Sequence, residues 1–410
     1  MFPGAVWRAA FAPDEGHKPS GSSGPPGLSG PPDPSEPPDP NGPYAQGDPG
    51  GPFPPEVLQA LPPGFTGRIV ARSGERTGGV VWHAAPDGGG CFPDGDGWIY
   101  VSNCSLPLLG GVTALRFAPD GTLRDGCRVL SGADCSGAGA ATPWNTWLSG
   151  ERTPYGQVFE CDPYGLRAPM PRLAMGLFSH GGVACDPDRG VVYLTEREPD
   201  GCLYRFRPDD WGDLTTGVLE VMTGAPGEEE VGWERVPAPA GAQVVFGEHA
   251  PIAGHMPLRD QVKAARRFTA GGECHCRDGL LWFVTEGDGR VWAYDVVHER
   301  LTVAHDAADR PGDPAGGEQG GQQGAGQDGG RRSEQNGGQG GGQGGEITLV
   351  AADRMVPFLR VTGGWTVSGP AMSPAGDRLY FSCRPPRSAG PAPVSVTVEV
   401  CGPFLDLVRG

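Results

Sequence analysis

The most constraining feature of this chain is a short pattern that repeats along it. Each copy has an apolar run of strand length, an acidic or amide residue at its end, a turn, and a second strand. The clearest copies cover residues 191–206 and 280–294, with an Asp-Gly step in the turn, and looser copies cover residues 98–117 and 146–161. Asp-Gly between apolar runs is a strong signal for a tight β-hairpin. Hairpins that bury their faces only against one another predict an all-β array, either radial or stacked.

The first strands of these hairpins end in oxygen-bearing side chains. Asn103, Glu151, Glu196 and Glu286 hold equivalent places in the four copies. If the hairpins are blades around an axis, these side chains converge on a central channel and need cations there. Oxygen donors suit Ca²⁺ or Mg²⁺, and a thiolate would extend the choice to a transition metal. The alternative is that these residues are simply exposed in turns.

The composition divides the chain into folded and non-folded parts. The 410 residues include 71 glycines and 45 prolines, and only 37% are hydrophobic. Residues 1–53 are rich in proline and glycine, and residues 311–345 are rich in glycine and glutamine. Neither segment can bury enough apolar surface to offset the entropy of ordering, so we expect both to be disordered. One domain is therefore expected over residues 54–410, interrupted by the 311–345 insertion.

Charge and hydropathy limit the classes of partner. The formal net charge of −17 argues against binding to nucleic acid, which needs a basic surface. No apolar run approaches the roughly 20 residues of a membrane-spanning helix. The first residues show no readable export signal, which leaves the compartment open.

Several motifs, in the same order along the chain, resemble the PhoX family of alkaline phosphatases. They lie at residues 82–93, 142–147, 178–180, 203–206, 271–273, 290–295, 356–361 and 368–374. The Thr-Pro-Trp-x-Thr-Trp motif at residues 142–147 is distinctive. The resemblance implies a β-propeller of six blades, present as a monomer. It also implies a cluster of iron and calcium at one end of the channel, which hydrolyses small phosphomonoesters.

The resemblance also implies a set of metal ligands. Cys135, Glu151 and Glu273 match metal-site motifs of the family, and Glu196 and Asn103 lie at matching strand ends. A polynuclear cation cluster would grip the phosphate oxygens and supply a metal-bound nucleophile. Two structural interpretations stay open beside this one. Cys135 can be a buried thiol, and Glu273 can cap a turn after its two glycines.

Four positions depart from the family pattern where acids are usual: Arg152, Gly181, Arg197 and Thr366. We expect Gly181 to open a gap in the ligand shell. The two arginines are expected either to face solvent or to occupy the place of a lost cation. In the second case the channel would still attract phosphate but could not activate water.

Two functions therefore stay open. The chain is either a metal-dependent phosphomonoester hydrolase with a reduced ligand set, or a non-catalytic propeller that binds a cation or a small anion in its channel. The 311–345 tract also takes the place of a strand pair of the family. Either one blade is incomplete, which would leave unpaired strand edges, or the tract is a non-native stretch such as an unspliced region.

Overall fold

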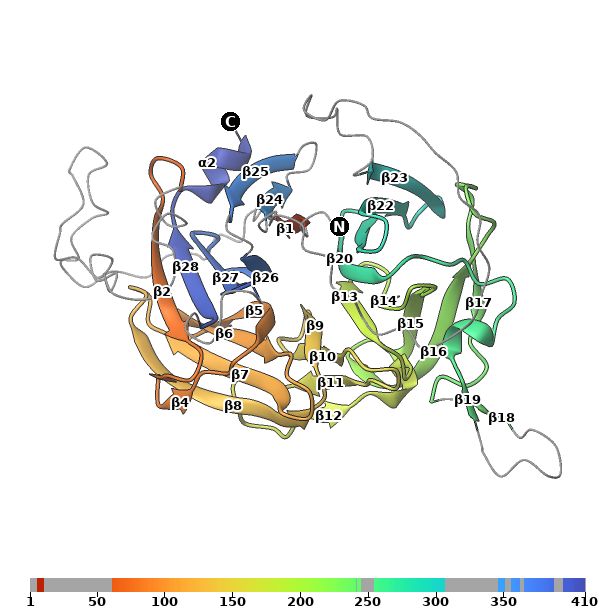
Figure 1. Cartoon of the computed structure of the whole chain (residues 1–410), viewed down its shortest axis with the longest axis horizontal. Coiled ribbons are helices and arrows are strands. Elements are labelled where there is room, and N and C mark those ends of the chain that lie inside the picture. Colours follow the sequence, from red (N-terminus) through yellow and green to blue (C-terminus); the bar gives the residue numbers. More distant parts are fainter. Residues whose placement is uncertain are drawn as a thin grey trace, which may run out of the picture.

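The computed structural model of this chain is a ring of small β-sheets arranged around a central axis (Figure 1). It describes residues 6–10, 61–240, 242–244, 254–306, 346–350, 355–361, 365–386 and 394–409. The domain boundary expected at residue 54 and the segment 311–345 lie outside the described residues. Within residues 1–53, only strand β1 (Val6–Ala10) is described.

Five sheets of four or five strands form the main blades. The first blade contains β5 (Pro86–Asp94), β6 (Gly97–Cys104), β7 (Gly110–Phe117) and β8 (Leu123–Ala133). The second contains β9 (Ser136–Ala141), β10 (Trp147–Glu151), β11 (Val158–Cys161) and β12 (Met170–Pro171). The third contains β13 (His180–Asp186), β14 (Val191–Glu196), β15 (Leu203–Asp210), β16 (Asp213–Thr223) and β17 (Gly232–Arg235).

The remaining blades complete the ring. The fourth contains β20 (Gly271–Arg277), β21 (Leu280–Thr285), β22 (Arg290–Asp295) and β23 (Arg300–Asp306). The fifth contains β26 (Thr366–Met372), β27 (Arg378–Arg384), β28 (Val396–Cys401) and β2 (Thr66–Arg72). Because β2 pairs with β28, the start and the end of the described ring are joined in one sheet.

A smaller sheet lies between the fourth and fifth blades (Figure 1). It contains β1, β24 (Glu346–Val350) and β25 (Met355–Arg360). The two-stranded sheets are β3 (Arg76–Thr77) with β4 (Val80–Val81), and β18 (Ala242–Val244) with β19 (Gly254–Met256). The short helices are η1 (Leu173–Met175), η2 (Leu258–Asp260) and α2 (Phe404–Arg409).

The hairpins predicted from the sequence form the centres of the blades. Strands β6 and β14 are buried at every position, because each is covered on both faces by neighbouring blades. Every strand pair among the described residues is antiparallel except β1 with β24. The prediction of an all-β propeller with little helix is thus confirmed. We expected six blades with one incomplete, and the described residues form five full blades and one three-stranded sheet.

The core lies between the blades. Trp147 belongs to a cluster that joins the first two blades, Phe178 to one that joins the second and third, and Tyr193 to one that joins the third and fourth. Phe381 packs between the fifth blade and the β24–β25 strands. In the described part of the chain, no apolar cluster joins β24–β25 to the fourth blade.

No helix within the described ranges is long and apolar enough to cross a lipid bilayer.

Candidate functional site

Six charged side chains from five blades meet where the inner strands converge, and we call them the channel cluster. They are Asp87, Arg152, Arg197, Glu273, Glu286 and Arg384. Asp87 and Glu273 lie on the inner strands β5 and β20. The other four lie at or directly after the ends of β10, β14, β21 and β27, which are the second strands of their blades. The sequence repeat therefore delivers these side chains to one face of the ring.

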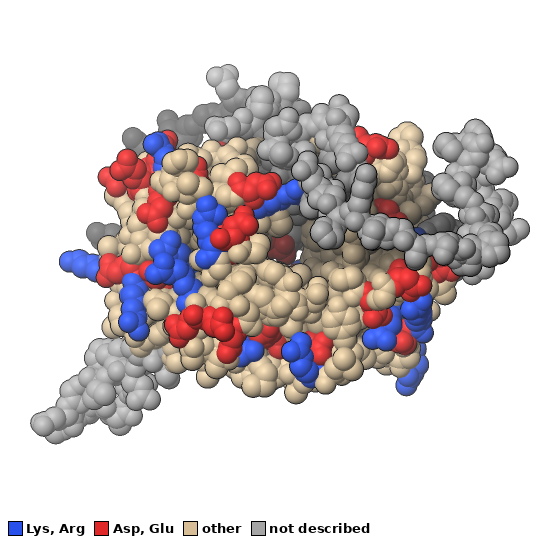
Figure 2. All heavy atoms as spheres, turned by 180° about the vertical axis from the view of Figure 1, so that it is seen from behind, with Lys and Arg blue, Asp and Glu red and all other residues tan. Residues whose placement is uncertain are grey.

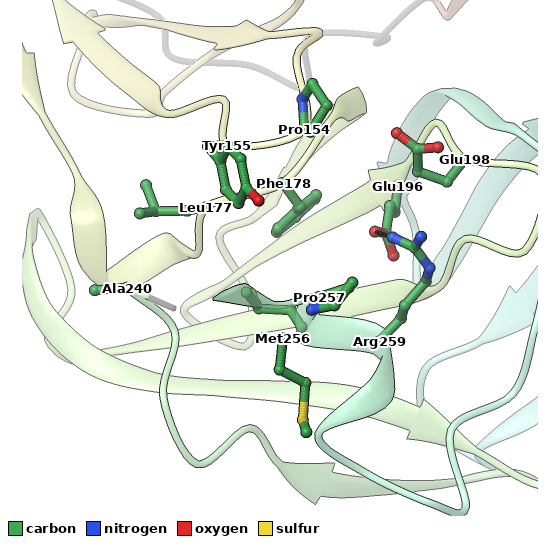
Figure 3. A pocket seen from close by; sticks show the side chains of 11 residues that line it. Pro154, Tyr155, Leu177, Phe178, Glu196, Glu198, Ala240, Met256, Pro257 and Arg259 are labelled. Atoms are coloured by element: carbon green, nitrogen blue, oxygen red, sulfur yellow. Dashed lines mark hydrogen bonds and ion pairs between the residues drawn. The ribbon is translucent and has the colours of Figure 1, made fainter. Parts of the chain in front are cut away.

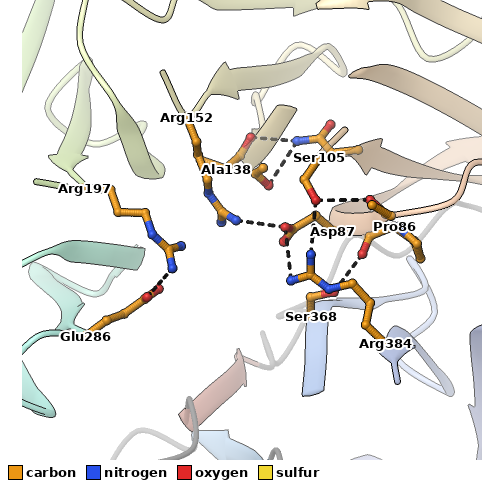
Figure 4. Close-up of polar contacts among 12 residues, drawn as sticks. Pro86, Asp87, Ser105, Ala138, Arg152, Arg197, Glu286, Ser368 and Arg384 are labelled. Carbon is orange, nitrogen blue, oxygen red and sulfur yellow. Dashed lines mark hydrogen bonds and ion pairs between the residues drawn. The ribbon is translucent and has the colours of Figure 1, made fainter. Parts of the chain in front are cut away.

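Ion pairs join five of the six members of the channel cluster into two groups (Figure 4). Arg152 Nη1 lies 2.8 Å from Asp87 Oδ2, and Arg384 Nη2 lies 3.5 Å from the same oxygen. On the opposite side, Arg197 pairs with Glu286. The Asp87 side chain is only 1% exposed and that of Arg152 13%, whereas those of Arg197 and Arg384 are 35% and 33% exposed. Arg197 and Arg384 therefore keep about a third of their side-chain surface exposed.

Burial also changes the protonation of the channel cluster. Burial raises the pKa of Glu273 to about 8, against the pull of the Arg152 guanidinium, and the nearby Asp87 and Glu286 add to the rise. Burial, together with the like charges of Arg152 and Arg384, lowers the pKa of Arg197. At pH 7 Glu273 is mostly neutral, because the pH is below its pKa. Three guanidinium groups then face two carboxylates.

Two buried polar atoms of the channel cluster lack a hydrogen-bond partner among the described residues. They are Asp87 Oδ1 and Arg152 Nε. An unpaired buried polar atom costs about 1–3 kcal/mol, so such atoms are common where a ligand binds.

Most of the side chains predicted to bind metal form hydrogen bonds within the protein. Asn103 donates to the carbonyls of Gly137 and Ala138 and accepts from Trp147 Nε1 at 2.8 Å and from Ser149 Oγ at 3.1 Å. These bonds join the first blade to the second. Asn103 is thus a fully bonded core residue.

Both carboxylate oxygens of Glu151 and of Glu196 accept hydrogen bonds from the protein. The Glu151 oxygens accept from the backbone N–H groups of Asp134 at 2.7 Å and Gln157 at 3.0 Å. Glu196 Oε1 accepts from Arg259 at 2.7 Å, and Oε2 accepts from Tyr204 Oη at 2.9 Å and from the Cys202 N–H at 3.2 Å. Burial raises the pKa of Glu196, and Arg259 works against that rise.

Cys135 and Glu273 lie in different surroundings. Cys135 has a φ of 54° in the turn between β8 and β9, near Glu151. Burial and the neighbouring Asp134 raise the pKa of its thiol, which disfavours the thiolate that binds metal. Glu273 alone of the five joins the channel cluster.

The donors present do not fit an iron–calcium cluster. Within the described ranges, no group of three or more His, Cys, Asp or Glu side chains is placed to hold a metal ion. Three guanidinium groups stand among the channel carboxylates, and two of the predicted ligands give both oxygens to protein donors.

The departures from the family pattern have clear positions. Arg152 and Arg197 both point toward other members of the channel cluster and not to the outer surface of the ring. The expected gap at Gly181 is absent: a Cβ there would lie 1.8 Å from the carbonyl oxygen of Gly271, because β13 and β20 pack closely. Thr366 is exposed and lies opposite Arg384 in the β26–β27 pair.

Sequence reasoning missed Asp87 and Arg384 as site residues. Asp87 lies inside a motif of residues 82–93 that carried the family resemblance, and Arg384 ends β27 just as Glu196 ends β14. Glu286 was selected because it lies at the end of a predicted strand, and the same reasoning could have found Arg384.

Ion pairs outside the channel cluster include pairs in which both side chains are exposed to solvent. Acidic and basic side chains are interspersed over the face shown in Figure 2. Arg124 and Asp96 form one exposed ion pair, 3.3 Å apart with 43% and 73% of their side chains exposed. Such exposed pairs contribute little to stability.

The comparisons with known proteins agree with this architecture. Residues 151–270 match the family model of alkaline phosphatase PhoX. The structure is similar to PhoX of Pseudomonas fluorescens, solved in complex with vanadate, a transition state analogue. The TM-score is 0.58 at 14% identity, over 84% of this chain and 96% of that one.

Weaker similarities involve other solved structures. A gluconolactonase of Xanthomonas campestris gives a TM-score of 0.34 at 11% identity, over 84% of this chain and 92% of that one. An α-L-arabinofuranosidase of Podospora anserina gives 0.38 at 9% identity, over 82% and 95%. No curated protein sequence matches the chain. In the sequence of residues 151–270 and in its propeller fold, the chain thus resembles the PhoX alkaline phosphatases, as its motifs predicted.

Proposed function

We propose that this protein binds the phosphate group of a small phosphomonoester in its channel, as a phosphatase-type propeller in which guanidinium groups replace metal ions. The observation that carries the proposal is the inward position of Arg152 and Arg197, which stand where the family pattern has acids.

The channel cluster has the chemistry that a phosphate group requires. Guanidinium groups bind phosphate oxygens by paired, charge-assisted hydrogen bonds. The acidic partners of Arg197 and Arg384 use only some of their N–H groups, because a guanidinium has five N–H donors. With Glu273 neutral at pH 7, three positive charges face two negative ones, which favours an anion. The orphaned Asp87 Oδ1 could accept a hydrogen bond from a protonated phosphate oxygen.

Metal-dependent hydrolysis of phosphomonoesters is the second candidate. The match of residues 151–270 to the phosphatase family favours it, and iron and calcium are the ions that the resemblance implies. The described donors do not form a set for these ions, so binding is the part of the function that the geometry supports. A nucleic-acid partner is not proposed, and a monomer remains the expectation.

The test is isothermal titration of the protein with inorganic phosphate. One charge-assisted hydrogen bond contributes about 1.5–3 kcal/mol, so Arg197→Ala should weaken binding at least tenfold. Arg124→Ala is the matched control, because Arg124 forms an exposed pair on β8, and it should bind like the wild type. Equal affinity in Arg197→Ala and wild type would contradict the proposal.

A second assay separates the two candidates. Hydrolysis of p-nitrophenyl phosphate is measured with and without added iron and calcium. Turnover that appears only with the metals would favour the hydrolase. Phosphate binding without turnover under both conditions would favour the binding protein.

A further inference from the structure

A pocket of about 320 Å³ lies between segments of the second and third blades and the segment before η2 (Figure 3). It is formed by the turn after β10, the segment before β13, the end of β14 and the segment before η2. Its lining includes Tyr155, Leu177, Phe178, Met256, Glu196 and Arg259. The volume is at the lower end of the range for small-molecule sites, and mostly apolar walls with a few polar groups are typical of such sites.

The pocket and the channel cluster share two walls. After β10, Arg152 joins the channel cluster, whereas Tyr155 lines the pocket. After β14, Arg197 joins the channel cluster, whereas its neighbours Glu196 and Glu198 line the pocket. Each of these two segments thus contributes residues to both sites. The two sites are therefore adjacent.

The polar groups of the pocket restrict its ligand. Glu196 is buried and already holds hydrogen bonds from Arg259, Tyr204 and the Cys202 N–H, so it does not need a donor from a ligand. Glu198, partly exposed, places a further acidic side chain at the pocket and disfavours a second anionic group there. The aromatic walls, Tyr155 and Phe178, favour a flat apolar group.

We propose that this pocket binds the organic group of the phosphomonoester whose phosphate group lies at the arginines, and that this group is a neutral aromatic ring. The inference rests on the proposed function and adds a substrate class to it: aryl rather than short alkyl phosphate esters. Tyr155 and Phe178 would contact the ring, and Arg152 and Arg197 the phosphate group.

The test compares benzylphosphonate with ethylphosphonate, which are not hydrolysed because they contain a carbon–phosphorus bond. Affinities are measured by isothermal titration against the full chain, with inorganic phosphate as the reference. Benzylphosphonate should bind about tenfold more tightly than ethylphosphonate, which corresponds to about 1.4 kcal/mol.

Two pocket variants should remove this preference. Tyr155→Ala removes an aromatic wall, and Ala240→Trp fills the pocket, so each should bring the ratio near one and leave the affinity for inorganic phosphate unchanged. Leu166→Ala is the control, because Leu166 is an exposed apolar residue outside the pocket, and it should keep the tenfold ratio.

The outcomes separate the two proposals. Phosphate binding with equal affinity for both phosphonates would overturn the aromatic pocket alone, as would a tenfold ratio that persists in both pocket variants. Failure of inorganic phosphate and both phosphonates to bind the wild type would overturn the proposed function as well.

Discussion

The pair of Arg152 and Asp87 allows a quantitative test of the channel cluster. Arg152 Nη1 lies 2.8 Å from Asp87 Oδ2, and the Asp87 side chain is 1% exposed. Removing one partner of a buried pair costs about 3–5 kcal/mol, because it leaves a buried charge without compensation. Arg384 stays 3.5 Å from the same oxygen, so we expect the lower end of that range. Arg152→Met should therefore lower the free energy of unfolding by about 3 kcal/mol.

A double-mutant cycle tests the cause of that loss. In Asp87→Asn/Arg152→Met both charges are removed, so the net loss should fall to about 1 kcal/mol, well below the sum of the losses in the two single variants. The free energies come from urea denaturation at pH 7 followed by tryptophan fluorescence. A loss below about 0.5 kcal/mol in Arg152→Met, or a double variant no more stable than the single one, would refute the buried pair.

Three further predictions concern protonation, packing and the inter-blade contacts. The pKa of Glu273 is about 8 in the folded protein and 4.5 ordinarily, so the native state holds an extra proton between these values. Stability should therefore fall as the pH rises from 4.5 through 8, and thermal denaturation should show a smaller fall for Glu273→Gln. Gly181→Glu should abolish soluble expression rather than restore a metal site, since even a Cβ would clash with the Gly271 carbonyl; normal yield and melting temperature would contradict this. Asn103→Ala should cost about 2–4 kcal/mol in urea denaturation, because four hydrogen bonds of about 1 kcal/mol each are lost; a loss below 1 kcal/mol would mean that these bonds do not join the blades.

The sequence predicted the elements of the fold well. The apolar run at residues 191–196 forms β14 with the same bounds. A run of β-branched and aromatic residues bounded by turn signals strongly favours a strand. The closure of the ring by β2 and β28 was not predicted, since it joins segments more than 300 residues apart by backbone bonds that leave no local pattern.

The site was predicted in part. The sequence pattern at the strand ends selected Glu286, and the family motifs selected Glu273; both lie in the channel cluster. The pattern could not show which way a strand-end side chain turns. Glu196 turns into the blade because Arg259, 63 residues further along the chain, meets it there. Such partners are set by tertiary packing.

Phosphate titration of the protein after exhaustive treatment with a chelator tests the central claim most directly. The account places phosphate recognition on Arg152, Arg197 and Arg384, so it predicts that the affinity for inorganic phosphate is the same before and after chelation, with iron and calcium verified as absent by elemental analysis. Loss of phosphate binding on chelation, with recovery on adding iron and calcium, would contradict it.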